Sequence, residues 1–376
     1  MFGEETVMMR VLRLGMLFMT TTAVCSAQDR PIVGAIRWDA WTGGHVTEQV
    51  ERTLGPKKYH DRLPWFAEVV DDATVKIDGS PQTVMDREIE FAASAGLDYW
   101  AFLLYPKDNP MSMALGQYLK SQKRDQIRFC LILHNTLKVT DDKWPAERNR
   151  AIGLLQESRY QTVLTNRPLV YAFAGDKFPF GRFREFLIAA RDRGLNPYCV
   201  YMGWNPTRDY NDVKDYGFDA VSAYAMPGDQ PNFAGLVKSV RNRYWLDAAS
   251  SGIPYVPLVT TGWDKRPRKE TPVSWEKGHV YHRQEVFPSR ATPDEIADHL
   301  WQALAFVRTH ARICSANAVI VYAWNEYDEG GWLAPTRGQD GTPDTSRLDA
   351  IRRALESQER TERTPAGDVP KAAPEE

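Results

Sequence analysis

Two glutamates, Glu326 and Glu329, lie three positions apart near the end of the 376-residue chain, with Asp328 between them. They follow residues 318–324, an apolar run with the composition of a strand buried on both faces. If the chain turns helically after this strand, both carboxylates point to the same side. Glycoside hydrolysis requires two carboxylates that flank the scissile bond. We therefore predict that Glu326 and Glu329 are catalytic.

Aromatic residues surround the two glutamates, namely Trp324, Tyr327 and Trp332. Three aromatic rings are unusual in an exposed acidic loop, whereas they are typical of residues that line a pocket. Neighbouring carboxylates raise each other's pKa, and desolvation by Trp side chains raises it further, which keeps one carboxyl protonated as a general acid. Two simpler interpretations stay open. The segment is a solvated loop after a core strand, or Glu329 only braces the loop.

Eight apolar segments predict strands, and amphipathic segments between them predict helices. The strands are expected at 31–39, 97–105, 128–134, 168–173, 198–204, 218–224, 255–261 and 318–324. The helices are expected at 80–96, 111–123, 146–160, 181–193, 233–248 and 293–310. Ser80 is expected to cap the first of these helices, and Thr292 with Glu295 forms a capping box for the last.

This alternation predicts an α/β protein with a single (β/α)8 TIM barrel. A doubly wound open sheet is the rival, but no Gly-rich phosphate loop opens a helix. The polar and aromatic segment after the first strand contains His45, His60 and Trp65 and exceeds normal loop length. We expect it to be an active-site insertion with some structure of its own.

Polar and aromatic residues fall at the C-terminal ends of the predicted strands, which meet at one mouth in a closed barrel. The predicted substrate-binding residues are Asp39, Trp41, Tyr105, His134, Trp204, Tyr224, Trp263, Asp264, Asn325 and Trp332. Two of these have a structural alternative. Asp264 can instead pair with Arg266 or Arg268, and His134 can be a structural histidine at a strand end.

Composition narrows the class of partner. Hydrophobic residues make up 43% of the chain, which is enough for a sizeable core. The net charge of −2 argues against nucleic acid or an anionic membrane as a partner. No His-Glu-x-x-His or Gly-x-Ser-x-Gly element occurs, and His279 with His282 is poor support for a metal site. We expect a carbohydrate partner and no metal or cofactor, and the composition does not specify an oligomeric state.

The first residues have the pattern of a secretory signal peptide. Arg10 and Arg13 precede the apolar run 14–19, and residues 25–27 fit a small-residue cleavage site. The run is too short to span a bilayer, so no stable membrane insertion is expected. We predict a signal peptide at 1–27, a barrel at 28–356 and a flexible tail at 357–376, in a secreted or periplasmic protein. Cys130, Cys199 and Cys314 are expected to be buried thiols.

Three segments resemble the glycoside hydrolase family 99-like group, which contains endo-α-mannosidases and the WbsX-type proteins of polysaccharide gene clusters. Ala323-Trp-Asn-Glu-Tyr-Asp-Glu-Gly330 is similar to the group's Trp-Asn-Glu-Trp-x-Glu-Gly motif. Gly262-Trp-Asp264 resembles an element of the WbsX branch, and Gly96-Leu-Asp-Tyr-Trp-Ala-Phe102 resembles the second strand. The resemblance extends from residue 32 to residue 335, and only the eighth-strand motif is specific.

The resemblance implies a division of labour between the two glutamates. In the endo-mannosidases the first Glu of the motif acts as a base on the 2-hydroxyl of the sugar, which gives an epoxide-like intermediate. The second Glu protonates the leaving oxygen, so these roles fall on Glu326 and Glu329. The chain departs from the motif at Tyr327, where Trp is usual, and at Ala334, where the group has a Glu. A manno-configured sugar is expected, and the loss of that carboxylate makes rhamnose-like sugars as compatible as mannose.

Two further functions stay open at the level of the sequence. A barrel of this kind can bind carbohydrate without cleaving it, its acids only holding hydroxyl groups. Some WbsX-type proteins are described as glycosyltransferases. The predicted signal peptide counts against a transferase, because sugar nucleotides are cytoplasmic.

Overall fold

The computed structural model describes residues 30–173, 178–276, 278 and 280–363. The predicted signal peptide and the end of the predicted tail lie outside these residues. The final helix α11 (Ser346–Arg363) continues past residue 356, so the start of the predicted tail is helical. Within the described part of the chain, no helix is both long enough and apolar enough to cross a bilayer.

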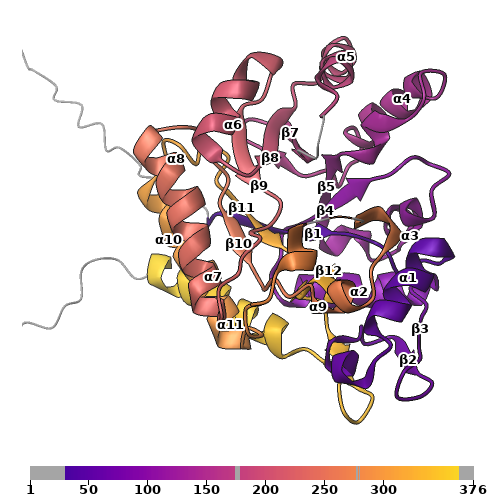
Figure 1. Ribbon diagram of the computed structural model, residues 1–376. Helices are drawn as coiled ribbons and strands as arrows, with labels where there is room; N and C mark the ends of the chain where they lie inside the picture. The colour runs from indigo at the N-terminus through magenta and orange to yellow at the C-terminus, as the bar shows by residue number, and fades with distance from the viewer. Residues whose placement is uncertain (1–29, 174–177, 277, 279, 364–376) are drawn as a thin grey trace, which may run out of the picture.

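A parallel sheet of eight strands, each hydrogen-bonded to its neighbours, forms the centre of the molecule (Figure 1). The strands are β1 (Ile32–Arg37), β4 (Tyr99–Leu104), β5 (Arg128–Leu133), β7 (Arg167–Phe173), β8 (Tyr198–Gly203), β9 (Ala220–Ala223), β10 (Leu258–Thr260) and β11 (Ala318–Tyr322). They lie in the order β10-β11-β1-β4-β5-β7-β8-β9. A parallel bridge between Val221 and Tyr255 joins the two ends of this order and closes the barrel. The predicted TIM barrel is confirmed.

Helices surround the barrel on the outside, as Figure 1 shows. They are α2 (Gln82–Ser94), α3 (Met113–Lys120), α4 (Trp144–Leu154), α5 (Phe180–Arg191), α6 (Pro206–Val213), α7 (Phe233–Val240), α8 (Leu246–Ser251), α10 (Pro293–Thr309) and α11. The predicted capping box of α10 is present, since Thr292 and Glu295 bond each other's backbone.

Three details of the helical layer differ from the sequence-based expectation. Helix α2 begins after Pro81 without a side-chain cap, so the prediction that Ser80 caps it is wrong. The segment expected as one helix at 233–248 is α7 and α8 joined by a π-helical turn, η6 (Arg241–Trp245). Helix α6 was not expected, although Asn205 caps it by accepting a hydrogen bond from the Arg208 amide.

The insertion after β1 has structure of its own, as expected. It contains α1 (Gly44–Leu54), a 3-10 turn η1 (Lys57–Arg62) and a small hairpin of β2 (Ala67–Val69) and β3 (Val75–Ile77). The backbone of this segment contacts the segment that follows the eighth barrel strand, because the Trp65 amide donates to the Pro335 carbonyl. Further short pairs are β6 (Thr162–Val163) with β7, and β14 (Thr336–Arg337) with β15 (Pro343–Asp344).

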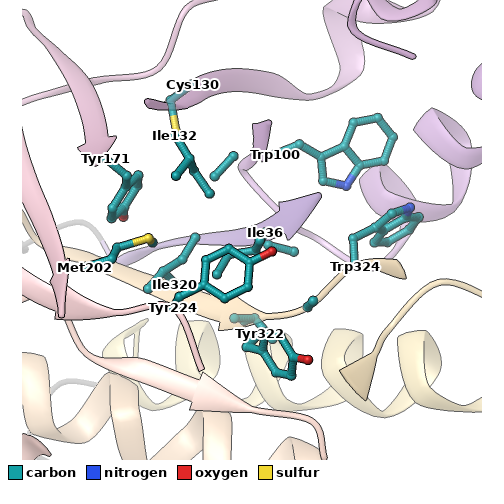
Figure 2. Packing of buried hydrophobic residues seen from close by; sticks show 14 of the residues in the cluster. Ile36, Trp100, Cys130, Ile132, Tyr171, Met202, Tyr224, Ile320, Tyr322 and Trp324 are labelled. Atoms are coloured by element: carbon teal, nitrogen blue, oxygen red, sulfur yellow. The ribbon is translucent and has the colours of Figure 1, made fainter. Parts of the chain in front are cut away.

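Side chains from alternate positions of the strands fill the barrel. Figure 2 shows Ile132, Tyr171, Met202 and Ile320 converging from four different strands. All four are fully buried. Because side chains alternate between the two faces of a strand, the residue two positions further along each strand faces the same interior, one layer closer to the mouth. Cys130, Cys199 and Cys314 are buried free thiols, as predicted.

Gly34 on β1 leaves space for a large side chain inside the barrel. A Cβ atom at Gly34 would lie 2.2 Å from the ring of Tyr99. That ring is fully buried, and its hydroxyl lies 2.8 Å from the hydroxyl of Tyr171 and donates to the Val319 carbonyl. The Tyr99 side chain therefore has no free direction in which to move.

We predict that Gly34→Ala lowers the free energy of unfolding by about 1–3 kcal/mol, the usual cost of overpacking a core. Gly116→Ala is the matched control, since Gly116 lies in α3 and a Cβ there meets no atom within 4 Å. The control is expected to gain about 0.4–1 kcal/mol through reduced entropy of the unfolded chain. Chemical denaturation of both variants measures the two effects, and equal stability of both variants would contradict the predicted overpacking.

Candidate active site

A cavity of about 690 Å³ opens where the barrel strands end. Seven predicted site residues line it, namely Tyr105, His134, Trp204, Tyr224, Trp263, Glu326 and Glu329. They follow six different strands of the barrel, from β4 round to β11. The C-terminal mouth of the barrel is therefore the candidate active site, as the positions of the polar residues predicted.

The eighth strand delivers both glutamates through a tight hairpin. After β11 the chain forms β12 (Asn325–Glu326), a 3-10 turn η9 (Tyr327–Glu329) and β13 (Gly331–Trp332), which pairs with β12. The expected helical turn is thus present, and it places both Glu326 and Glu329 on the cavity wall.

Glycines allow this hairpin to pack closely against the chain after β10. Gly330 has a φ of +84°, and a Cβ there would lie 2.4 Å from the Asp264 amide nitrogen. That amide donates to the Glu329 carbonyl at 2.7 Å. A Cβ at Gly331 would lie 2.4 Å from the ring of Tyr322, whose hydroxyl donates to Glu329 at 2.9 Å. Larger residues at either glycine would displace groups that position Glu329.

Glu326 lines the cavity and is 1% exposed. Its Oε1 accepts a hydrogen bond of 2.5 Å from the Tyr224 hydroxyl, and its Oε2 has no hydrogen-bond partner among the described residues. Burial, and then the charge of Glu329, raise the pKa of Glu326 well above its ordinary value, although Arg268 and the Tyr224 hydrogen bond oppose the shift.

Glu329 differs from Glu326 because two cations contact it. Its Oε1 accepts a hydrogen bond from Nη1 of Arg268, and its Oε2 lies 3.1 Å from Nζ of Lys265. Both cations are buried. The two glutamates of the motif therefore have different surroundings, since the carboxylate of Glu329 contacts two cations and that of Glu326 contacts the Tyr224 hydroxyl.

Arg268 connects most of the charged groups of the site. Its Nε and Nη2 contact Asp328 at 2.6 and 3.1 Å, and its Nη1 also contacts Glu276 at 2.9 Å. The guanidinium lies 4.8 Å from the ring centroid of Trp38 and is only 1% exposed. Asp328 is fully buried, so the carboxylate between the two glutamates holds Arg268 and does not face the cavity.

Three predicted residues form a support behind the cavity. Asn325 accepts a hydrogen bond from the Trp38 amide at 2.9 Å and donates to Asp39 at 3.2 Å. Asp39 also pairs with Arg37 at 2.7 Å, and burial raises its pKa to about 6 against the effect of that guanidinium. Trp41 packs edge-on against Trp38. Asn325, Asp39 and Trp41 do not line the cavity, so the structure places these predicted residues behind it.

Asp264 and Trp332 also lie away from the cavity. Asp264 pairs with Arg62 and with Arg266, both at 2.6 Å, so the ion-pair alternative describes it correctly for Arg266 and not for Arg268. Although burial opposes the shift, these two arginines lower the pKa of Asp264. Trp332 packs under the guanidinium of Arg347, whose distance to the ring centroid is 3.9 Å. The structure therefore does not bring these two residues to the cavity with the other predicted site residues.

Three further predicted residues, Tyr105, His134 and Trp204, line the cavity together with Phe173, which was not predicted as a site residue. We call these four residues the aromatic wall. His134 packs on Phe173 with ring centroids 4.9 Å apart. Burial lowers the pKa of His134 to about 4, which leaves the imidazole neutral near pH 7. Trp204 is 40% exposed at the rim and can stack on a ligand.

Several cavity residues were not predicted as site residues. Trp38, Lys265, Arg268, Trp275 and Glu276 all line the cavity. The last four come from the chain after β10, including the short helix α9 (Arg266–Glu270) and the 3-10 turn η7 (Ser274–Glu276). Trp38 could have been found from strand alternation, because it precedes Asp39 and must face the opposite side.

The described residues contain no group of three or more His, Cys, Asp or Glu side chains arranged to hold a metal ion. His282, half of the weak His279–His282 pattern, places its Nε2 3.0 Å from the Glu276 carbonyl. His279 lies outside the described residues.

No family model matches the sequence, and no curated protein matches it. Among solved structures, the fold is similar to the glycoside hydrolase family 99 endo-α-mannosidase from Bacteroides thetaiotaomicron in complex with bis-tris propane. The TM-score is 0.56 at 9% identity, over 88% of this chain and 97% of that chain. A second structure of that endo-α-mannosidase gives 0.53 at 10% identity, over 88% and 98%. The chain therefore has a family 99-like fold, as the resemblance of the eighth-strand motif implied.

Proposed function

We propose that the protein is a glycoside hydrolase whose catalytic carboxylates are Glu326 and Glu329. One observation carries the proposal: the eighth-strand hairpin brings two carboxylates to one aromatic-lined cavity. Glu326 has a raised pKa, whereas the carboxylate of Glu329 contacts cations. Glycosidic bond cleavage needs two such groups in different protonation states. The likeness of the fold to an endo-α-mannosidase supports the same class of reaction.

Glu326 suits the role of base. A carboxylate with a raised pKa is a stronger base than an ordinary glutamate, and its pKa lies closer to the operating pH. Its Oε2 needs a hydrogen-bond donor, and a sugar hydroxyl in the cavity can supply one. The Tyr224 hydroxyl holds the other oxygen and fixes the direction of the carboxylate.

Glu329 is the proposed acid, and it requires a proton for that role. Its carboxylate contacts both Arg268 and Lys265. We propose that Glu329 gains this proton when substrate binds. This requirement separates the two glutamates experimentally, because only one of them has to gain a proton.

The cavity favours a neutral sugar. Indole rings of Trp38, Trp263 and Trp275 line the cavity together with the charged groups and the aromatic wall. Flat aromatic faces stack on sugar rings, whereas the cations are already bound to carboxylates. We further propose that the protein is secreted or periplasmic and acts on a polysaccharide or glycan there, which agrees with the predicted signal peptide.

A panel of plant, algal and microbial polysaccharides, assayed for new reducing ends with the mature protein, tests the proposal. Release of reducing ends from one polymer, lost in Glu326→Gln, supports hydrolysis. Binding of a polymer without release would instead favour a carbohydrate-binding barrel.

The two glutamates are predicted to respond differently to the leaving group. Glu329→Gln should slow substrates with poor leaving groups and spare activated aryl glycosides, since those need no acid. Glu326→Gln should slow both by at least the roughly 10²–10⁴-fold that proton transfer contributes. Steady-state kinetics on one substrate of each kind decides the matter. Equal and mild losses in both variants would refute the assignment.

Glu326→Gln is also predicted to raise stability at neutral pH. The folded-state pKa of Glu326 is raised above its ordinary value of 4.5, so wild-type stability falls as pH rises through the window between the two values. Gln keeps the acceptor for Tyr224 and carries no charge, so the variant gains stability above this window and loses the advantage below pH 4.5. Thermal unfolding across pH measures the difference in stability between variant and wild type. Glu68→Gln, at the exposed position of β2, is the control. A pH-independent difference would contradict the shift.

The proposed use of the substrate's 2-hydroxyl predicts a requirement for that group. An oxygen that attacks the anomeric carbon must lie anti to the leaving group, which both α-mannosides and α-rhamnosides allow. We expect the manno-configured substrate to be cleaved and its 2-deoxy analogue, with the same aglycone, to be essentially inert. Comparable rates of hydrolysis would show that the hydroxyl is not the nucleophile, and Glu326 would need another role.

A further inference from the structure

We propose that Glu276 is a positioning residue that lets Glu329 alternate between its charged and protonated forms. The proposal rests on the proposed function, because it explains how an ion-paired glutamate can donate a proton. Glu276 lies in η7, outside the eighth-strand motif, and its carboxylate lines the same cavity.

Glu276 and Glu329 share the same two cations. Lys265 lies 2.8 Å from Glu276 and 3.1 Å from Glu329. Nη1 of Arg268 donates to both carboxylates, at 2.9 Å to Glu276. The four groups form a closed ring in which acidic and basic side chains alternate. Each cation therefore has a second carboxylate available when one is neutralised.

This sharing removes the main obstacle to an acid role for Glu329. Protonating a carboxylate that contacts two buried cations removes a negative charge from a low-dielectric site, which is costly unless another carboxylate remains beside those cations. With Glu276 present, Lys265 and Arg268 remain paired when Glu329 becomes neutral. Asp328 holds the other edge of Arg268 and prevents the guanidinium from moving away.

Other charged and titratable groups act on this ring. Glu329 faces Tyr322 at the end of β11, Tyr224 just after β9 and Glu326 on β12. It also faces the charged groups already described, namely Lys265, Arg268, Asp328 and Glu276. Glu276 faces the two cations, and its carbonyl lies 3.0 Å from the His282 ring. Burial and then the charge of Glu329 raise the pKa of Glu326, so these two carboxyl groups are coupled through space.

The cycle of the proton follows from these contacts. On substrate binding, Glu329 takes one proton from water while Glu276 keeps the cations paired. Glu329 then gives this proton to the leaving oxygen, which receives the electron pair of the breaking glycosidic bond. The anomeric carbon gains the 2-hydroxyl oxygen, whose proton passes to Glu326. Glu329 is left as a carboxylate and pairs again with Lys265 and Arg268. Water then adds to the anomeric carbon as the bond to the 2-hydroxyl oxygen breaks. Glu329 takes the proton of that water and Glu326 returns its proton to the 2-oxygen, and Glu329 gives its proton back to solvent when the product leaves.

Glu276→Gln tests the inference through the pH profile. Without the second carboxylate, both cations hold Glu329 in its charged form, so the basic limb of kcat/KM should move to lower pH. The rate on substrates with poor leaving groups should fall at neutral pH by up to the roughly 10²–10⁴-fold due to acid catalysis, and activated aryl glycosides should change little. Glu285→Gln, at an exposed glutamate of the same segment, is the control and should leave the profile unchanged.

Three outcomes of this assay are distinguishable. An unshifted basic limb in Glu276→Gln, with wild-type hydrolysis intact, would overturn the positioning role and leave the proposed function standing. A parallel loss on both kinds of substrate would assign Glu276 a purely structural role. A wild type without glycosidase activity would refute the proposed function and, with it, the proton cycle.

A thermal double-mutant cycle tests the shared cations without any substrate. Glu276→Gln and Glu329→Gln should each lower the Tm only slightly at neutral pH, because the remaining carboxylate still pairs with both cations. The double variant removes both carboxylate charges that Lys265 and Arg268 share in the ring, so its loss of Tm should clearly exceed the sum of the single losses. Additive losses would overturn the shared ring whatever the activity of the protein.

Discussion

The site depends on one buried cation, the guanidinium of Arg268. It contacts Asp328, Glu329 and Glu276 and packs over Trp38, so it links the hairpin after β11, the chain after β10 and the end of β1. A fully buried guanidinium is tolerated only when carboxylates satisfy it, and those carboxylates are tolerated only because the guanidinium is present. The buried ion pairs of Arg268 thus fix the relative positions of the elements around the mouth. These positions depend on charge as much as on apolar packing.

The barrel itself was predictable because parallel strands buried on both faces read as continuous apolar runs. The same runs located β11 and its two glutamates. The capping box of α10 was also readable, since it depends on Thr292 and Glu295 alone. These features rest on local sequence, and none of them requires knowledge of contacts between distant segments.

The errors came from treating every polar residue at a strand end as part of the mouth. Trp38 faces the cavity, and Asp39, the next residue, faces Arg37 and Asn325 behind it. The same alternation separates Trp263 from Asp264. Strand parity could have sorted these pairs in advance. Glu276 was beyond reach, because its position depends on how the long segment after β10 folds over the barrel.

The aromatic wall has a consequence for how such a protein can diversify. The residues of this wall lie at or just after the C-terminal ends of β4, β5, β7 and β8, namely Tyr105, His134, Phe173 and Trp204. The ring of charged residues comes from the segments that follow β10 and β11. In the strand order, β1 and β8 lie opposite each other across the barrel. The residues for proton transfer and the residues that select the ligand therefore come from different strands of the barrel. Substitutions in the aromatic wall can reshape the ligand that fits, while the ring of charged residues stays intact.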